Sequence, residues 1–438
     1  MSMVIKTNMD SIRTLNQVTT NHKMANDHLM KISTGLKVRN AQDDASAYAI
    51  SENMRVRIRA LDQAHSNTQN GSNMMKTAEG AIGSILDALR TLKEKAINAA
   101  NDSNSDEDRR MIQREFDQLV DQIDEDALIT FNNKYLIDGT RNNAFQPAKT
   151  ILLNQSLAVD TTADTALIEL RDRAGSSLEI QTNDYYQLSW VVNGKISTAS
   201  GQIGDMTLSE LLTIEDVSEV QETNDGQIMG ITDKFGNDVY TPDKSQGMVV
   251  SSVGTDEDEM KNQIAGFAIS ILDSEGNVKK SANAALDQFK QYQRAETKTG
   301  DQALSFQVGA DANFATKFAL TDMRTRALGL RGSDGDIISV LTKENANATI
   351  NVLDNVLKKV LDEQSHIGAA LSRFERTAMN LLTSFTNDQA SESVIRDADV
   401  ATEMASYLKY NVLSQSSQAM LAQANQNPKN VIALLRNK

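Results

Sequence analysis

Cysteine is absent from this 438-residue sequence, and proline and aromatic residues are scarce. Without cysteine the chain can form no disulfide, no thiolate metal site and no cysteine nucleophile. The only three prolines are Pro147, Pro242 and Pro428, so residues 1–146 and 243–427 contain none. Because proline interrupts helices, these two stretches favour long continuous helices over a loop-rich architecture.

Long apolar runs and catalytic motifs are missing as well. No segment approaches the roughly 18 consecutive apolar residues of a membrane span, so we expect no membrane partner. The N-terminus lacks the basic head and apolar core of a cleaved signal peptide, so export would need another route. Zinc-protease, phosphate-loop, dinucleotide-binding and nucleophile-elbow motifs are all absent, and we therefore expect no cofactor and no enzymatic activity.

Acidic charge is concentrated in the middle of the chain. The net charge is −15, and residues 147–304 carry 25 acidic but only 12 basic side chains. Nucleic-acid partners require a basic surface, so this distribution argues against them. The same segment contains no histidine, which argues against a zinc enzyme within it. We expect a solvated acidic surface.

Residues 394–438 predict a helix that is weak in isolation. Small and apolar residues recur there in steps of four and three, which defines one seam of a helix. The seam consists of Val394, Ala398, Ala401, Ala405, Leu408, Val412, Gln415, Ala419 and Ala422. At roughly 25 cal/mol per Å², a seam so rich in alanine buries too little surface to offset the ordering of its own backbone. Such a helix needs partners.

Pro428 is expected to end this C-terminal helix. A short apolar ending follows, formed by Val431, Ile432, Leu434 and Leu435. An apolar terminus after a polar, alanine-rich helix suggests docking into another chain.

The N-terminal stretch, residues 9–34, predicts a similarly weak helix that ends at Gly35. A heptad seam, interrupted by polar residues, follows this stretch and extends just past it, with Ile12, Leu15, His22, Leu29 and Leu36 near it. His22 and His28 lie in this stretch without further metal ligands at suitable spacing, so we interpret them as surface or packing residues.

Longer helices are predicted further along the chain. The pattern runs for about 55 residues from Ala45, with a phase slip near Gly71–Met75 that predicts an overwound turn or a break. Ser105 is placed to cap a third helix, and residues 353–385 show the clearest heptads. Large side chains of these helices should form a bundle core: Leu89, Phe116, Ile123, Leu353, Leu357, Ile367, Leu371 and Phe374.

The middle of the chain changes to the two-residue period of strands. Asn132–Asn133 predicts a hairpin, and Ala166–Leu170, Tyr186–Val192 and Met248–Val250 alternate as strands do. We therefore predict an α+β fold, in which a long helical coiled-coil or bundle core formed by both termini carries an inserted, mostly β outer domain. The predicted domains are residues 1–44 with 394–438, residues 45–146 with 304–393, and residues 147–303.

The two ends of the sequence resemble bacterial flagellin. The N-terminal half of the resemblance lies in Val4–Asn8, Ile32–Val38, Ala41–Ala45, Gln69–Gly71, Thr77–Ala81 and Thr130–Asn133. The C-terminal half lies in Phe306–Ala310, Asp322–Arg324, Ala327–Leu330, Ile395–Asp399, Gln423–Gln426, Pro428 and Val431–Arg436. The insert matches no family that we recognise.

This resemblance implies a structural subunit that polymerises with copies of itself into the flagellar filament outside the cell. It implies export, unfolded and without a cleaved signal, through the flagellar type III channel, and the export apparatus, a chaperone, the filament cap and hook-junction proteins as partners. The terminal helices would line the inner tube, the bundle would form the outer tube, and the insert would project into water. The residues expected to carry polymerisation are Ile5, Ile12, Leu15, Leu29, Leu36, Ala398, Ala405, Leu408, Val412, Ala419, Leu434 and Leu435.

Two alternatives remain within the resemblance. A hook-filament junction protein would share the terminal helices but form only a short collar, and a few flagellins carry an enzyme in the insert. The segment that an innate flagellin receptor recognises in this family corresponds here to Leu89, Arg90, Thr91, Lys93 and Glu94. Thr91 stands in place of the family's central arginine, which puts recognition by the receptor in doubt.

Overall fold

The computed structural model describes residues 8–144, 149–213, 218–221, 223–224, 227–233, 235–241, 247–252, 263–295 and 300–436. The chain divides into two compact units. Unit 1 comprises residues 1–68, 307–314 and 376–438, and unit 2 comprises residues 69–306 and 315–375. The described helices contain no apolar segment of the length that a membrane span requires.

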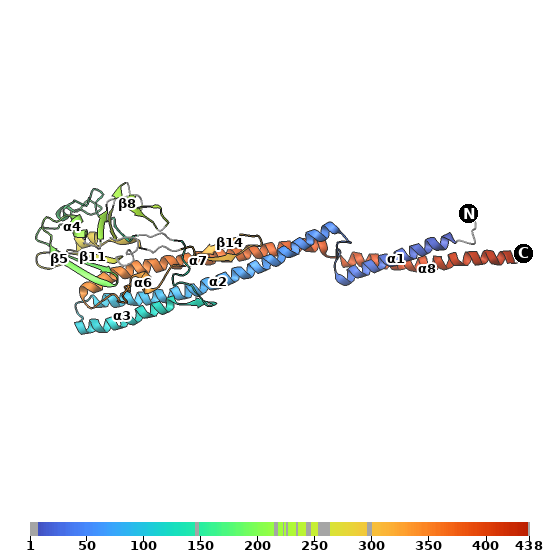
Figure 1. The fold of residues 1–438 in the computed structure, drawn as a ribbon, viewed down its shortest axis with the longest axis horizontal. Coiled ribbons are helices and arrows are strands. Elements are labelled where there is room, and N and C mark those ends of the chain that lie inside the picture. The colour runs from blue at the N-terminus through green and yellow to red at the C-terminus, as the bar shows by residue number, and fades with distance from the viewer. Residues whose placement is uncertain are drawn as a thin grey trace. The chain divides into compact units, whose positions relative to one another are not determined.

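Long helices dominate the described part of the chain, and the predicted α+β class is confirmed (Figure 1). The helices are α1 Met9–Thr34, α2 Ala45–Ala99, α3 Asp106–Ala127, α4 Leu208–Leu212, α5 Lys280–Leu286, α6 Thr325–Leu328, α7 Lys343–Arg396 and α8 Val400–Arg436, with a 3₁₀ turn η1 Leu167–Glu169. The strands are β1 Thr130–Phe131, β2 Lys134–Tyr135, β3 Ile151–Asn154, β4 Tyr185–Val192, β5 Lys195–Gln202, β6 Ser218–Gln221, β7 Thr223–Asn224, β8 Gln227–Thr232, β9 Asp238–Tyr240, β10 Met248–Ser252, β11 Ile264–Leu272, β12 Lys290–Gln293, β13 Leu304–Gln307 and β14 Ala315–Phe318.

The helix ends follow the capping residues of the sequence. Gly35 ends α1 in the left-handed conformation, with φ of 69°. Asp44 accepts hydrogen bonds from the Ser46 and Ala47 amides at the start of α2. Ser105 and Asp108 form a reciprocal capping box at the start of α3. The predicted bounds of the first two helices and the predicted start of the third are therefore confirmed.

The predicted break near Gly71–Met75 is wrong, because α2 is continuous there. A Cβ atom at Gly71 would lie only 2.9 Å from Phe374 Cζ and 3.1 Å from Phe306 Cδ1. Phe306 and Phe374 meet edge to face at 5.3 Å between ring centroids, and Phe318 lies 4.7 Å from Phe374. These three rings are here called the aromatic cluster, and the phase slip marks the place where two of them, Phe306 and Phe374, occupy the space of a missing side chain.

The predicted helix end at Pro428 is also wrong, because α8 continues to Arg436. Proline removes one helical hydrogen bond and costs about 3 kcal/mol in a helix interior. The carbonyl that it leaves without a helical donor belongs to Ala424, and this oxygen accepts a hydrogen bond from Asn8 Nδ2 at 2.9 Å. A tertiary contact thus compensates for the unfavourable local sequence.

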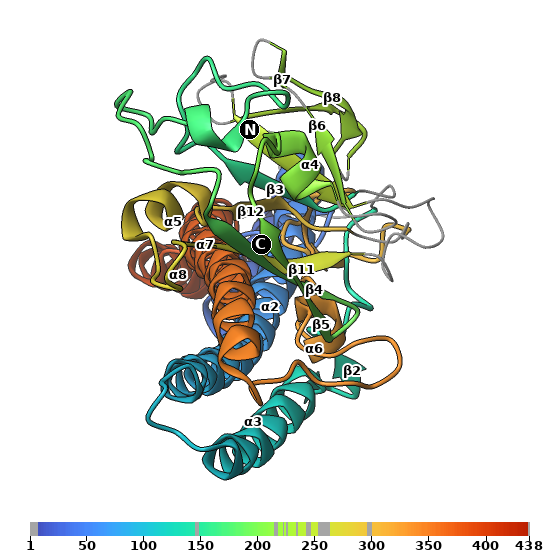
Figure 2. The same cartoon turned by 90° about the vertical axis from the view of Figure 1, so that its left-hand side faces the viewer.

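Within unit 2, α3 and the adjoining parts of α2 and α7 lie side by side (Figure 2). Lys93 of α2 pairs with Asp354 of α7, and Lys95 of α2 lies 2.8 Å from Glu115 of α3. Large apolar side chains on the facing surfaces are fully buried, as helix–helix packing requires. Charged pairs at the rim and apolar residues inside are the arrangement of a stable bundle.

The middle of the chain forms two larger sheets with orders β12-β3-β10-β6 and β11-β4-β5, and a smaller one with order β7-β8-β9. The predicted hairpin turn at Asn132–Asn133 is confirmed, and both asparagines have positive φ values, as do Asn193 and Gly194 in the turn between β4 and β5. The strand expected at Ala166–Leu170 is wrong. Leu167 and Leu170 are both buried and lie three residues apart, which is the period of the 3₁₀ turn η1.

Strand β11 connects the insert to the helical bundle inside unit 2. A Cβ atom at Gly266 would contact Val352 and the Ala348 carbonyl oxygen of α7, so the strand approaches the helix closely. Asn351 Nδ2 donates to the Phe267 carbonyl at 3.3 Å. The insert therefore shares a packed boundary with α7.

Candidate assembly interface on the terminal helices

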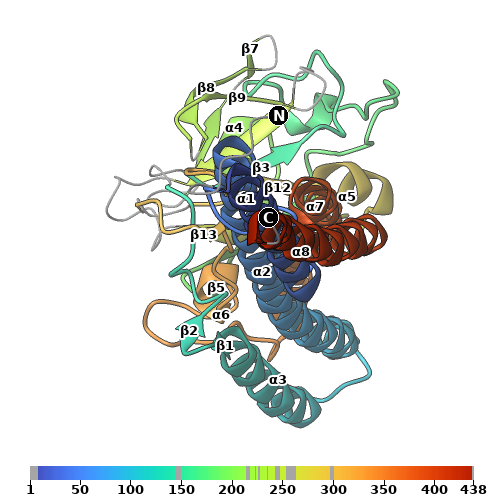
Figure 3. The same cartoon turned by 90° about the vertical axis from the view of Figure 1, so that its right-hand side faces the viewer.

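Helices α1 and α8 lie side by side in unit 1 (Figure 3). They are antiparallel, because Asn8 meets Ala424 while His28 meets Glu403. The less exposed positions of α1 include Ser11, Thr14, Val18, Asn21, Ala25, His28 and Ile32, and those of α8 include Glu403, Tyr407, Tyr410, Ser414, Ser417, Leu421 and Ala424. The two helices thus meet along seams of mostly small and polar residues.

Polar bonds hold this contact together. Asn21 Nδ2 donates to Ser417 Oγ at 3.0 Å, and both residues are buried. His28 Nδ1 lies 2.5 Å from Glu403 Oε2, and the His28 ring stacks on Tyr410 with centroids 5.4 Å apart. Such bonds specify how the helices pair but remove little apolar surface from water. His28 is thus a packing residue, as predicted.

The apolar seam predicted from the heptads faces outward on both helices. Leu15 of α1 is 51% exposed, and Leu408 and Val412 of α8 are 55% and 64% exposed. Ile12, Leu29, Ala405 and Ala419 are exposed too, whereas Leu36 and Ala398 are half-buried. Ile5 lies outside the described residues, and the side chains of Leu434 and Leu435, on the described backbone of α8, lie outside them as well. A single chain therefore leaves most of this seam uncovered.

More exposed apolar residues widen this surface. They are Met9, Met24 and Met30 of α1 and Val400, Met404, Leu413 and Met420 of α8. Apolar residues exposed in such number along two paired helices indicate a site of protein–protein contact. We call the outward residues Ile12, Leu15, Leu29, Ala405, Leu408, Val412 and Ala419 the outward seam.

Backbone hydrogen bonds join the two turns that precede α2 and α8. The Arg396 carbonyl accepts from the Lys37 amide at 2.7 Å, and the Ala398 amide donates to the Gly35 carbonyl at 2.9 Å. The Arg396 side chain is buried, lies over the Tyr48 ring and pairs with Glu52 at 2.5 Å. This hydrogen bond lowers the pKa of the Glu52 carboxyl below its ordinary value.

A second charged residue, Arg39, connects α1 to the turn that follows it. Arg39 lies 2.6 Å from Asp27 of α1 and 3.0 Å from Asp43 of the following turn. The hydrogen bond from Arg39 lowers the pKa of Asp43. Sequence periodicity did not identify Arg39, Arg396 or the buried pair of Asn21 and Ser417, because it detects apolar stripes and these contacts are polar.

The residues predicted for the bundle core lie mainly in the interior of unit 2. Leu89, Phe116, Ile123, Leu353, Ile367 and Phe374 are buried, whereas Leu357 and Leu371 are half-buried. The core is therefore formed by α2, α3 and α7 together.

Most residues of the predicted receptor segment are buried or form ion pairs and hydrogen bonds with other residues of the chain. Lys93 pairs with Asp354, Arg90 pairs with Asp87 at 2.8 Å, and the Thr91 hydroxyl donates to the Asp87 carbonyl at 3.0 Å. Leu89 is buried and Glu94 is exposed.

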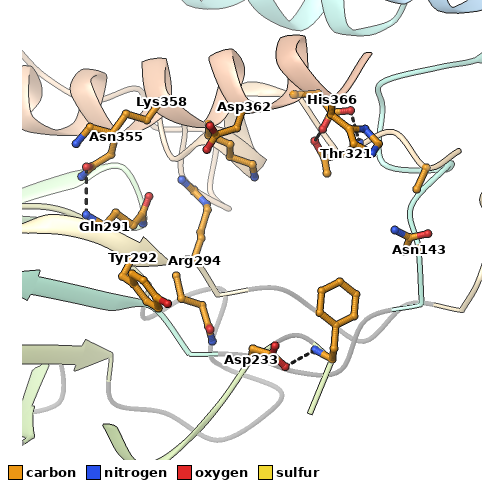
Figure 4. Close-up of a pocket in the computed structure, with 15 residues that line it drawn as sticks. Asn143, Asp233, Gln291, Tyr292, Arg294, Thr321, Asn355, Lys358, Asp362 and His366 are labelled. Carbon is orange, nitrogen blue, oxygen red and sulfur yellow. Dashed lines mark hydrogen bonds between the residues drawn. The ribbon is translucent and has the colours of Figure 1, made fainter. Parts of the chain in front are cut away.

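A pocket of about 510 Å³ lies within unit 2 between α7, β12 and the turn that follows β8 (Figure 4). Its lining includes Asn355, Lys358, Asp362, Glu363 and His366 of α7, and Asp233, Gln291 and Arg294. Glu363 accepts from the Thr321 hydroxyl at 2.8 Å, and Asp233 accepts from the Phe235 amide at 2.8 Å. These two carboxylates thus support the local structure. Among the described residues, no three His, Asp or Glu side chains are grouped to hold a metal ion.

Comparison with known proteins identifies the family. The model of the bacterial flagellin N-terminal helical region matches residues 5–142, and that of the C-terminal helical region matches residues 350–435. A flagellin from Clostridium tyrobutyricum is 30% identical over 425 residues, which cover 97% of this chain and 99% of the relative. A flagellin from Bacillus subtilis (strain 168) is 28% identical over 454 residues, covering 99% of this chain and all of the relative.

Solved structures are more distant. The flagellar hook associated protein-3 of Legionella pneumophila is 15% identical, covers 78% of this chain and 97% of its own, and superposes with a TM-score of 0.34. That score is too low to support an argument, so the assignment rests on the two matched regions and on relatives aligned over nearly their full length. The chain belongs to the bacterial flagellin family.

Proposed function

We propose that this chain is the structural subunit of a bacterial flagellar filament, and that the outward seam carries polymerisation. The observation behind this proposal is that α1 and α8 pair through mostly small and polar residues and leave the outward seam exposed to water. Contact between neighbouring copies would bury the apolar area that a single chain exposes, at roughly 25 cal/mol per Å². The missing stabilisation of the terminal helices would then come from assembly.

The three predicted domains fit this proposal as assembly roles. Residues 1–44 with 394–438 would line the inner tube, residues 45–146 with 304–393 would form the outer tube, and residues 147–303 would face the surroundings. The exposed outward seam supports the first role, and the buried core of α2, α3 and α7 supports the second.

As a filament subunit, the protein would function outside the cell. It would pass unfolded through the flagellar type III channel, accompanied by an export chaperone, and add beneath the filament cap beyond the hook-junction proteins. A chain without cysteine suits this route, because no disulfide has to form after export. Its role would be structural and not enzymatic.

Recognition by the innate flagellin receptor would be weak. Thr91 cannot supply the guanidinium of the family's central arginine, and Lys93 is already paired with Asp354. Both features reduce the charge that the segment could offer to a receptor.

The outward seam can be tested by replacing Leu408 and Val412 together with glutamine. We expect the double variant to form no filaments after addition of a salting-out agent, as seen by negative-stain microscopy. Thermal unfolding of its bundle should match that of the wild type, because both side chains are exposed in the single chain. A matched control replaces Met111 and Val278, which are equally apolar and exposed, with glutamine; it should polymerise normally.

Long filaments from the seam variant would contradict the proposal. Wild-type protein that forms only short collars would favour a hook-filament junction protein instead. Removing residues 425–438 should likewise leave a folded bundle that cannot polymerise.

A further inference from the structure

Helix α8 passes through a proline, and this leaves one backbone group without its usual partner. Pro428 has no N–H, so the carbonyl of Ala424, four residues earlier, has no donor within the helix. Ala424 is only 8% exposed, so water has little access to replace that donor. A buried carbonyl without a donor would destabilise the helix at this point.

The missing donor comes from the other end of the chain. Asn8 Nδ2 donates to the Ala424 carbonyl at 2.9 Å across a separation of 416 residues. The Oδ1 atom of the same side chain accepts from the Ser11 amide at 3.1 Å and thereby caps α1. Beside it, Ser11 Oγ donates to Asn425 Oδ1 at 2.7 Å. One amide group thus caps α1 and completes α8.

We propose that Asn8 is a positioning residue that allows α8 to continue past Pro428 only while α1 is docked against it. The contact sets the register of the antiparallel pair at one end, as Asn21 with Ser417 does further along. It also makes the order of residues 425–436 depend on the N-terminal helix. A role of this contact in filament assembly rests on the proposed function. The link between Asn8 and the order of residues 425–436 does not.

Two substitutions, one at position 8 and one at position 428, test whether the side-chain amide of Asn8 replaces the N–H that Pro428 lacks. Aspartate at position 8 keeps an oxygen that can cap α1 but has no N–H to offer Ala424. Alanine at position 428 restores the backbone N–H, so the Ala424 carbonyl regains a helical donor and no longer needs Asn8. The effect of Asn8→Asp should therefore depend on the residue at position 428.

The experiment compares four full-length proteins: wild type, Asn8→Asp, Pro428→Ala and the double variant. Hydrogen–deuterium exchange with mass spectrometry is measured for peptides covering residues 425–436 in protein assembled with a salting-out agent. We expect Asn8→Asp to speed exchange there by about tenfold in the wild-type background. In the Pro428→Ala background we expect less than about a threefold change. Asn16→Asp, which adds the same charge at an exposed position of α1, should leave exchange unchanged.

An equal effect of Asn8→Asp in both backgrounds, or no effect in either, would overturn the inference. If Asn8→Asp does not assemble, recovery of filaments in the double variant supports the coupling, and failure of the double variant refutes it. If wild-type protein itself does not assemble, the proposed function fails. The same exchange comparison on the four monomers then still decides whether Asn8 supports α8.

Discussion

At the scale of single residues, Gly71 allows α2 to pass the aromatic cluster. Replacing it with alanine improves helix propensity by about 1 kcal/mol but places a methyl group against Phe374 and Phe306. Because the contact at 2.9 Å involves ring atoms in a packed core, we expect the clash to exceed the gain. The free energy of unfolding should fall by about 1–2 kcal/mol, measured by urea denaturation.

Gly83 provides the matched control for this prediction. It lies on the same helix, and nothing is within 4 Å of a Cβ atom built there. Gly83→Ala should stabilise the protein by up to about 1 kcal/mol. If both substitutions stabilise the protein equally, the aromatic cluster does not require the absence of a side chain at position 71.

Asp287 makes the stability of the protein depend on pH. Burial raises the pKa of its carboxyl from 3.8 to about 6, although the Ile269 amide and Asn351 donate to it. Since the folded state then binds the proton more tightly, stability contributed by this group is present at low pH and is lost as pH rises from about 4 to 6. Asp287→Asn should remove this loss, raising the free energy of unfolding near pH 7 by up to about 3 kcal/mol and near pH 4 very little.

Unfolding measured at both pH values tests this prediction. Asp273 offers a contrast, because hydrogen bonds from Asn277 lower the pKa of its carboxyl. Asp273→Asn should destabilise the protein at neutral pH, and the effect should fade as pH falls through the folded pKa of this group. An unchanged pH slope in Asp287→Asn would refute the assignment.

The residue scale is also where sequence reasoning was least complete. It located the outward seam through its apolar period but not the seam that α1 and α8 use, because Asn21, Ser414 and Ser417 resemble ordinary surface residues. Periodicity shows that a stripe exists and cannot show which protein surface covers it. The role of Asn8 required knowledge of a contact 416 residues away.

At the scale of elements, Arg396 connects the end of α7 with α2 and the turn after α1. Its guanidinium is buried against Tyr48 and pairs with Glu52, and its carbonyl accepts from Lys37. Arg396→Ala should lower the stability of unit 1 by about 1–3 kcal/mol, because the packing and the charged hydrogen bond are lost together. Limited proteolysis should then cut residues 35–44 faster than in the wild type.

Arg55→Ala is the control for this substitution, since Arg55 is exposed and its ion pairs are long, at 3.5 Å. Exposed pairs of this kind contribute roughly 0–1 kcal/mol, so cleavage should change little. Equal protection in Arg396→Ala and wild-type protein would show that the backbone bonds alone hold these turns.

Helix limits and hairpin turns could be predicted because their signals are local. Gly35, Ser105 and Asn132–Asn133 act through neighbouring backbone groups. The sheet order β12-β3-β10-β6 could not be predicted, because it pairs strands distant in sequence. The helix end predicted at Pro428 was wrong for the same reason. Proline does destabilise the helix locally, but the Asn8 side chain, distant in sequence, donates the missing hydrogen bond.

At the scale of the whole molecule, the ends of the insert lie together. Ala295 N donates to Thr150 Oγ1 at 3.0 Å, and β12 pairs with β3. Replacing residues 151–294 with a short Gly-Ser linker is therefore geometrically feasible. We expect such a variant to polymerise, because the outward seam is untouched, and to unfold at a lower temperature, because Val352 and Ala348 lose β11 as their cover.

The deletion should also expose Val352 and thereby promote aggregation. Adding Val352→Gln to it should reduce this aggregation without restoring the lost stability. Negative-stain microscopy and scanning calorimetry measure the two properties separately. Deletion protein that unfolds like the wild type would show that β11 contributes nothing to α7.

The close approach of β11 to α7 also limits how the outer part of the filament can diversify. Strands β5 and β9 lie at the edges of their sheets and could accept new loops or foreign epitopes. Gly266 cannot accept a side chain without displacing Val352. Stable chimeras should therefore retain β11, which packs against α7, and vary only the rest of the insert. The boundary between retained and replaceable sequence thus lies within the insert and not at its ends.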